Sequence, residues 1–112
     1  MNNISFDDFM KVEICVGTIL TAEINNNLNN PAIVLTIDFG KKIGIKKSSA
    51  QLIANYTCDS LIKRQILAVV NFAPRQVGKI ISEVLVLGLS DNNNQPVLIS
   101  PDSNIKNGKK IY

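Results

Sequence analysis

Short segments rich in Val, Ile and Thr recur along the whole chain, with Asn, Gly and Pro between them. Residues branched at Cβ favour extended backbone, whereas Asn, Gly and Pro favour turns. This alternation constrains the fold more than any other feature of the sequence, because it predicts many short strands and leaves little chain for helices. The predicted strands span residues 13–24, 32–39, 43–47, 65–72, 83–89 and 96–100.

Glycine, proline and asparagine also predict where these strands bend or end. Gly17 lies inside the first strand and predicts a bend or a bulge there. Residues 25–30 include five asparagines and predict a loop. Pro74 and Gly78 mark a second loop between the fourth and fifth strands.

Only two short helices are predicted. One spans residues 6–11 and begins after Ser5, whose hydroxyl can cap it. Ser48 or Ser49 can cap the other, over residues 50–55. Short strands with one helix after the third strand predict an all-β OB-fold, a five-stranded Greek-key barrel with its helix between strands three and four. A ferredoxin-like fold would need two longer helices, which the sequence lacks.

Three features of the chain predict a single cytoplasmic domain. The length of 112 residues is typical of one domain, and no linker or repeat divides residues 1–112. The first residues have neither the basic start nor the apolar stretch of a secretory signal. No apolar run reaches the length of a membrane span.

The chain contains no histidine, which removes the commonest general base and the commonest metal ligand. Residues 40–48 resemble a P-loop only superficially, because their spacing of Gly, Lys and Ser differs from that motif. Cys15 and Cys58 lack the C-x-x-C spacing of a zinc site and are predicted to be reduced thiols. The sequence therefore predicts a non-catalytic protein without metal or cofactor.

The net charge of +3 is unevenly distributed. Residues 1–40 carry a net charge of −4 and residues 83–112 carry none, whereas residues 41–82 carry +7. A basic segment of this size in a small domain indicates a surface for a polyanion. The alternative is an ordinary solvated face, which most runs of charge form. The eight cations of the segment are Lys41, Lys42, Lys46, Lys47, Lys63, Arg64, Arg75 and Lys79.

Residues 71–79, Asn-Phe-Ala-Pro-Arg-Gln-Val-Gly-Lys, place two cations and a rigid turn at the end of an apolar strand. Cations held beside the face of a barrel suit contacts to phosphate. A plain basic loop is the alternative interpretation.

Several ordered motifs resemble the tRNA-binding domain family, which includes the C-terminal module of bacterial methionyl-tRNA synthetases and free-standing tRNA-binding proteins. The main ones are Asn71-Phe-Ala-Pro-Arg75 with Gly78, and Ser82-Glu-Val-Leu-Val-Leu-Gly88. The Ser-Glu-Val-Leu variant is most similar to the CsaA-type branch, small cytosolic proteins described as export-related chaperones. Supporting matches cover nearly the whole chain, at residues 7–9, 16–19, 38–40, 43–46, 48–51, 66–72, 101–102 and 107–109.

The resemblance implies an OB-fold, a homodimer, no catalysis and a basic surface that takes tRNA. Two positions depart from the synthetase-type modules. Those modules usually carry Arg where this chain has Cys15, and Ser-Gln-Gly-Met or a similar run at residues 82–85. Glu83 therefore puts an acid beside the expected RNA surface.

The first expected function is non-catalytic binding of structured RNA, above all tRNA, with phosphates on the cations and hydrogen bonds from polar side chains. The chain has four Phe, two Tyr and no Trp, and most of these rings are predicted to be buried. This favours recognition of the shape and backbone of a folded RNA over stacking on its bases. The expected RNA-binding residues are Lys41, Lys42, Lys46, Lys47, Ser48, Ser49, Asn71, Arg75, Lys79 and Ser82.

The second expected function is a cytosolic chaperone that binds unfolded preproteins for export. It rests on the resemblance and needs an exposed apolar groove. Apolar residues within 6–10 and 84–89 predict a homodimer if they lie on the surface. The alternative is that these segments complete the core of a single copy.

Overall fold

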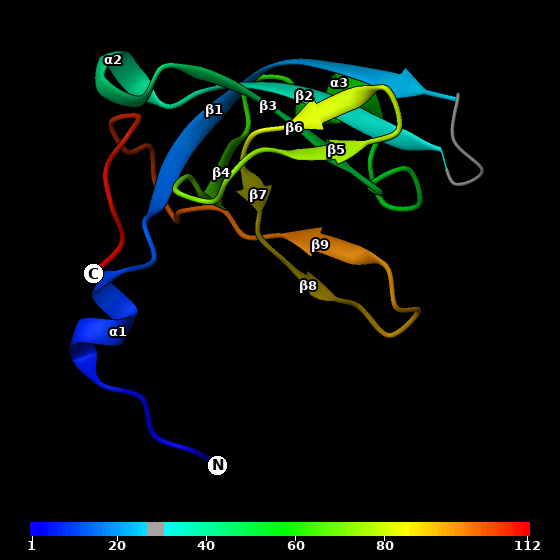
Figure 1. Ribbon diagram of the computed structural model, residues 1–112. Helices are drawn as coiled ribbons and strands as arrows, with labels where there is room; N and C mark the ends of the chain where they lie inside the picture. Colours follow the sequence, from blue (N-terminus) through cyan, green and yellow to red (C-terminus); the bar gives the residue numbers. More distant parts are fainter. Residues whose placement is uncertain (27–30) are drawn as a thin grey trace.

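A computed structural model describes residues 1–26 and 31–112 of the chain (Figure 1). Five strands form one curled antiparallel sheet in the order β3–β2–β1–β4–β7. The prediction of an all-β, OB-like fold is confirmed. The strands of this sheet are β1 (Ile14–Asn25), β2 (Ala32–Asp38), β3 (Ile45–Ala50), β4 (Gln65–Val69) and β7 (Leu85–Val86).

The predicted asparagine-rich loop lies mostly outside the described residues, which omit residues 27–30. Asn25 still belongs to β1 and pairs with Ala32 of β2.

The inner side of the sheet forms the core. Ile33, Leu35 and Ile37 of β2 are buried, as an alternating strand with one inward face requires. Gly17 of β1 is where the Phe39 ring packs onto the strand, because a Cβ at residue 17 would lie 2.7 Å from that ring. Of the bend or bulge predicted at Gly17, the bulge is wrong, since the register of β1 against β2 shifts between Ile19 and Thr21 instead.

Two small hairpins extend from the sheet (Figure 1). The segment around Pro74 was predicted as a loop, yet it forms β5 (Arg75–Val77) and β6 (Ile80–Ser82) around Gly78, whose φ of 63° permits the tight turn. The predicted strand 83–89 divides into β7 and β8 (Gly88–Ser90). The division arises because β8 leaves β4 and pairs with β9 (Pro96–Leu98).

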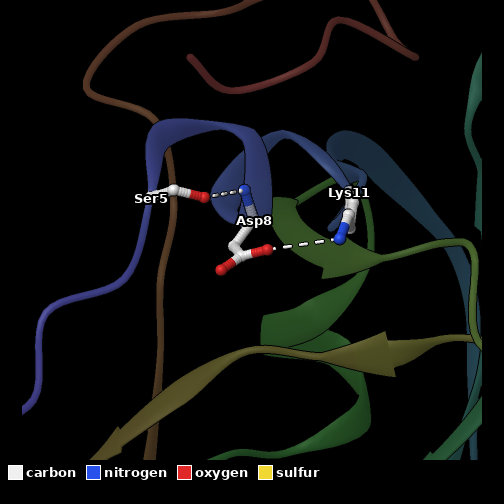
Figure 2. Close-up of polar contacts among 3 residues, drawn as sticks. All are labelled: Ser5, Asp8 and Lys11. Atoms are coloured by element: carbon white, nitrogen blue, oxygen red, sulfur yellow. Dashed lines mark hydrogen bonds and ion pairs between the residues drawn. The ribbon is translucent and has the colours of Figure 1, made fainter.

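The N-terminal helix forms as predicted. α1 spans Phe6–Met10, and the Ser5 hydroxyl accepts a hydrogen bond of 3.0 Å from the backbone N–H of Asp8 (Figure 2). The Asp8 carboxylate in turn lies 3.2 Å from the Lys11 ammonium group. Both contacts are solvent-exposed and stabilise only the short helix α1.

The second predicted helix lies elsewhere. Ser48 and Ser49 remain in β3, paired with Leu35 and Val34, so neither begins a helix at residue 50. The helix between strands three and four is α3 (Cys58–Leu61), which begins at a capping box formed by Thr57 and Ser60. A further single turn, α2 (Gly40–Ile43), joins β2 to β3. No helix in residues 1–26 and 31–112 is long and apolar enough to cross a membrane.

Candidate functional site

Four of the ten expected RNA-binding residues line one hollow of about 460 Å³ at the seam where β3 meets the segment after β6. We call it the serine pocket. Ser48 and Ser49 come from β3, Arg75 begins β5, and Ser82 ends β6. The other lining residues are Ala50, Phe72, Ala73, Glu83, Val84, Leu85 and Val86.

The three serines are held by hydrogen bonds across the seam. The hydroxyl oxygens of Ser48 and Ser82 lie 3.4 Å apart, and each is within 3.3 Å of the Val84 carbonyl oxygen. The backbone N–H of Ser49 donates to the Ser82 hydroxyl at 3.3 Å. Ser48 is only 2% exposed, so it forms the floor of the pocket.

Glu83 closes the seam beside the serines. Its backbone N–H donates to the Lys47 carbonyl oxygen at 2.8 Å, and its Oε1 accepts from the Lys47 N–H at 3.0 Å. The carboxylate therefore accepts the hydrogen bond from Lys47 that the backbone carbonyl of a neighbouring strand would accept in a regular sheet. Its Oε2 lies 3.9 Å from the ammonium group of Lys46. The acid expected beside the RNA surface thus bonds β3 and offsets one of the expected cations.

The wall of the serine pocket is apolar. Phe72 is 55% exposed and Leu85 is 47% exposed, and both line the hollow with Ala73 and Val86. The expectation that most rings are buried is wrong, because only Phe39 among the described aromatic residues is buried. Phe72 ends the apolar segment 65–72 that was predicted as one strand, so composition alone makes it look like a core residue, but β4 ends at Val69.

The remaining expected residues are dispersed. Lys47 lies on the exposed side of β3, and Lys79 lies in the turn between β5 and β6. Asn71 already has a structural role, because its side chain donates to the Lys11 carbonyl at 2.8 Å and accepts from the Glu13 N–H at 3.0 Å. Lys41 and Lys42 line neither wall nor floor of the serine pocket.

Lys41 and Lys42 belong to a second, open hollow of about 710 Å³ between α2 and the turn at residues 106–109. We call it the lysine pocket. Lys106 and Lys109 line it from the other side, and neither was among the residues expected from the sequence. Other lining residues are Phe39, Gly40, Ile43, Asn107 and Gly108.

The fold and the two hollows define a small OB-like barrel with basic side chains on its surface. Residues 14–110 match the family described as "Putative tRNA binding domain", and the chain belongs to this family. The resemblance seen in the sequence motifs is therefore confirmed.

Relatives of two kinds are similar to the chain. The methionine–tRNA ligase of Parabacteroides distasonis is 29% identical over 111 residues, which cover 97% of this chain and 16% of the ligase. The chain thus spans about one-sixth of the length of that curated relative.

Two solved structures resemble it over their whole length. The chaperone CsaA from Bacillus anthracis is 42% identical with a TM-score of 0.92, covering 99% of this chain and 100% of that one. The CsaA chaperone protein from Picrophilus torridus is 44% identical with a TM-score of 0.89, covering 98% and 100%.

Proposed function

We propose that the protein binds tRNA without catalysing a reaction. The observation that carries the proposal is the serine pocket, where Ser48, Ser82 and Arg75 line one hollow in a member of a tRNA-binding domain family. Hydroxyl groups and guanidinium groups are common contacts of phosphate and ribose. The surface around the pocket is basic, with Lys47 exposed on β3.

In this proposal the RNA backbone lies along β3 and the β5–β6 hairpin. Lys47, Arg75 and Lys79 are exposed and contact phosphates. Lys46 contributes less, because the Glu83 carboxylate is within 3.9 Å of its ammonium group. Phe72 adds one exposed ring on which an unpaired base can stack, so contact extends beyond the backbone.

Fluorescence anisotropy of labelled total tRNA, measured from low to physiological salt, tests the proposal. We expect micromolar or tighter binding at low salt, with the logarithm of the binding constant falling linearly with the logarithm of salt. The variant R75E/K79E should weaken binding and flatten this slope. The control K11E/K63E makes the same change of charge at residues that line neither pocket. Absence of binding by the unmodified protein at low salt would overturn the proposal.

A second candidate function is a chaperone that holds unfolded preproteins in the cytosol. The apolar wall of the serine pocket favours it, because exposed Phe72 and Leu85 can accept apolar side chains of an extended segment. The two similar solved structures are of chaperones. Suppression of light scattering by a reduced, unfolding client protein tests this function. It should persist at high salt and be lost in F72S/L85S, whereas phosphate contacts weaken with salt.

We also propose that the protein is a homodimer. Exposed apolar side chains at α1 and on the β8–β9 hairpin support this, with Phe6 71% exposed and Leu89 67% exposed. Val84 by contrast is buried within its own copy. Light scattering coupled to size exclusion should give twice the monomer mass. The variant F6D/L89D should elute as a monomer, and a monomeric unmodified protein at all concentrations would contradict the proposal.

A further inference from the structure

The lysine pocket joins two parts of the chain that are far apart in sequence. α2 lies beside the C-terminal segment at one end of the barrel (Figure 1), and the two contribute Lys41, Lys42, Lys106 and Lys109 to one hollow. All four lysines are exposed. No acidic residue lines the hollow, and none of the four has an ion pair within the described part of the chain.

The backbone beneath these lysines is rigid, because two glycine turns pack against each other. A Cβ on Gly108 would lie 2.5 Å from the Phe39 carbonyl oxygen, and a Cβ on Gly40 would lie 2.7 Å from the Asn107 carbonyl oxygen. Both glycines also have φ near 90°, which side chains of L-residues rarely adopt. The two turns thus approach as closely as bare backbone allows.

Hydrogen bonds attach the same turns to the sheet. The Gly108 N–H donates to the Val16 carbonyl at 2.8 Å, and the Val16 N–H donates to the Lys109 carbonyl at 3.0 Å. The Asn107 Oδ1 accepts from the Thr18 hydroxyl at 2.7 Å. The nearby acid, Asp38, directs its Oδ1 to the Gly40 N–H at 2.8 Å and does not line the hollow.

Four ammonium groups that share one hollow without a counter-ion repel one another, and a bound anion relieves this repulsion. Lysine is a common phosphate ligand and acts as a point charge at the end of a flexible stem. A fixed backbone with four such stems suits neighbouring phosphates of a polyanion better than a single small ion, because several charges can be met together.

We propose that the lysine pocket is a second phosphate-binding site for RNA, separate from the serine pocket, in which Lys106 and Lys109 act with Lys41 and Lys42. This inference rests on the proposed binding of tRNA. It extends the RNA-binding surface to the turn at residues 106–109, outside the basic segment 41–82.

The test compares tRNA binding by K106Q/K109Q, K41Q/K42Q and the control K11Q/K63Q, each of which removes two positive charges. Each pocket variant should lower the salt slope by about 1.4–1.8 and weaken binding at least about tenfold near 0.1 M salt, as the loss of two phosphate contacts requires. The control should change the salt slope and the tRNA affinity by only a small fraction of these amounts. Thermal melting by circular dichroism confirms that each variant is folded.

If tRNA binds and K106Q/K109Q behaves like the control, the inference is overturned while the proposed function stands. If the unmodified protein binds no tRNA at low salt, the proposed function fails, and the assignment of this pocket to RNA fails with it. Where tRNA does bind, titration with tripolyphosphate distinguishes RNA phosphate from free polyphosphate as the ligand of this pocket. Binding of tripolyphosphate that is lost in K106Q/K109Q, with tRNA binding unchanged, would make the pocket a site for free polyphosphate and overturn the RNA assignment.

Discussion

The serine pocket and the lysine pocket lie on the same small barrel but treat charge in opposite ways. In the serine pocket the polar atoms bond one another across a seam, and the acid Glu83 lies 3.9 Å from the ammonium group of Lys46. In the lysine pocket four cations surround a hollow that no acidic residue lines. The polar groups of the serine pocket are neutralised by contacts within the protein. The lysine pocket instead carries positive charge that the protein does not neutralise and that an anionic ligand can neutralise.

This difference teaches that density of charge in a sequence is a poor guide to density of charge in space. The segment 41–82 carries a net charge of +7, but its cations lie on α2, on β3, after α3 and on the β5–β6 hairpin. One of them, Arg64, stacks over the Tyr56 ring at 5.4 Å from its centroid. The segment 83–112 is neutral overall, yet it supplies two of the four lysines of the lysine pocket.

The largest effect is expected from Gly108→Ala, which breaks the frame of the lysine pocket without touching a lysine. The added Cβ would meet the Phe39 carbonyl oxygen at 2.5 Å, and φ of 93° adds strain. We expect a loss of at least about 2 kcal/mol in the free energy of unfolding, measured with urea. Gly44→Ala is the control, since a Cβ there meets nothing within 4 Å and adds strain alone. A loss no greater than that of the control would refute a role for the close backbone contact.

The next effect concerns Cys15, whose backbone forms an isolated antiparallel β-bridge with Lys110, just after the turn that lines the lysine pocket. Burial raises the pKa of this thiol above its ordinary value of 9.0, and the negative charge of Glu13 adds to the shift. At pH 8 the folded protein therefore holds less thiolate at this position than an ordinary cysteine would. In C58S we expect the remaining thiol to react with a disulfide reagent about tenfold or more slowly than a free thiol, with a rate still rising above pH 9.

The same labelling reaction sharpens the comparison between the pockets. Adding Gly108→Ala to C58S should release the C-terminal segment and accelerate the reaction of Cys15. Adding Ser82→Ala, on the serine pocket side, should leave that rate unchanged. Equal acceleration by both substitutions would show that the two pockets are not structurally independent.

A smaller effect is expected at the acid of the serine pocket. Glu83→Ala removes the acceptor of the Lys47 N–H and should cost about 1 kcal/mol in the free energy of unfolding, because the site is partly exposed. Glu83→Gln keeps an oxygen acceptor and should cost less. Because Gln carries no charge, it should also free Lys46 and tighten tRNA binding. Weaker tRNA binding by this variant would contradict the idea that the acid offsets a phosphate contact.

The smallest effect is expected from Ser82→Ala. This substitution removes the acceptor of the Ser49 N–H, a long hydrogen bond of 3.3 Å at a half-buried site. We expect a loss of roughly 0.5–1 kcal/mol in urea unfolding and faster amide exchange at Ser49. Ser103→Ala is a matched control, because Ser103 is exposed and outside both pockets. Unchanged exchange at Ser49 would show that this bond contributes nothing.

Local patterns predicted β1 to β4 and the capping of α1 by Ser5, because alternation and caps depend on residues near in sequence. They missed the β5–β6 hairpin, which was predicted as a loop. They misplaced the second helix. Ser48 and Ser49 are good caps by type, but pairing with β2 and bonds to Ser82 and Val84 keep them in the sheet. Tertiary contacts overrode a local preference there.

The candidate sites were harder to predict, since each is assembled from distant segments. The expected residues Ser48, Ser49, Arg75 and Ser82 do meet, but the apolar wall with Phe72 was not foreseen. Lys106 and Lys109 were missed because they lie in a neutral segment, next to the Asn107-Gly108 turn that brings them to α2. The Asn-Gly dipeptide is typical of a turn, but its position beside Gly40 depends on contacts between segments far apart in sequence.

The contact between Gly40 and Gly108 also has a kinetic consequence. Residues 41–107 separate the two turns, so the chain must close a very long loop before the contact can form. We expect it to be absent from the transition state for folding. Gly108→Ala should then accelerate unfolding while leaving the refolding rate nearly unchanged in a chevron plot. The lysine pocket would be the last part of the molecule to assemble and the first to open, so an anion bound there would slow unfolding specifically.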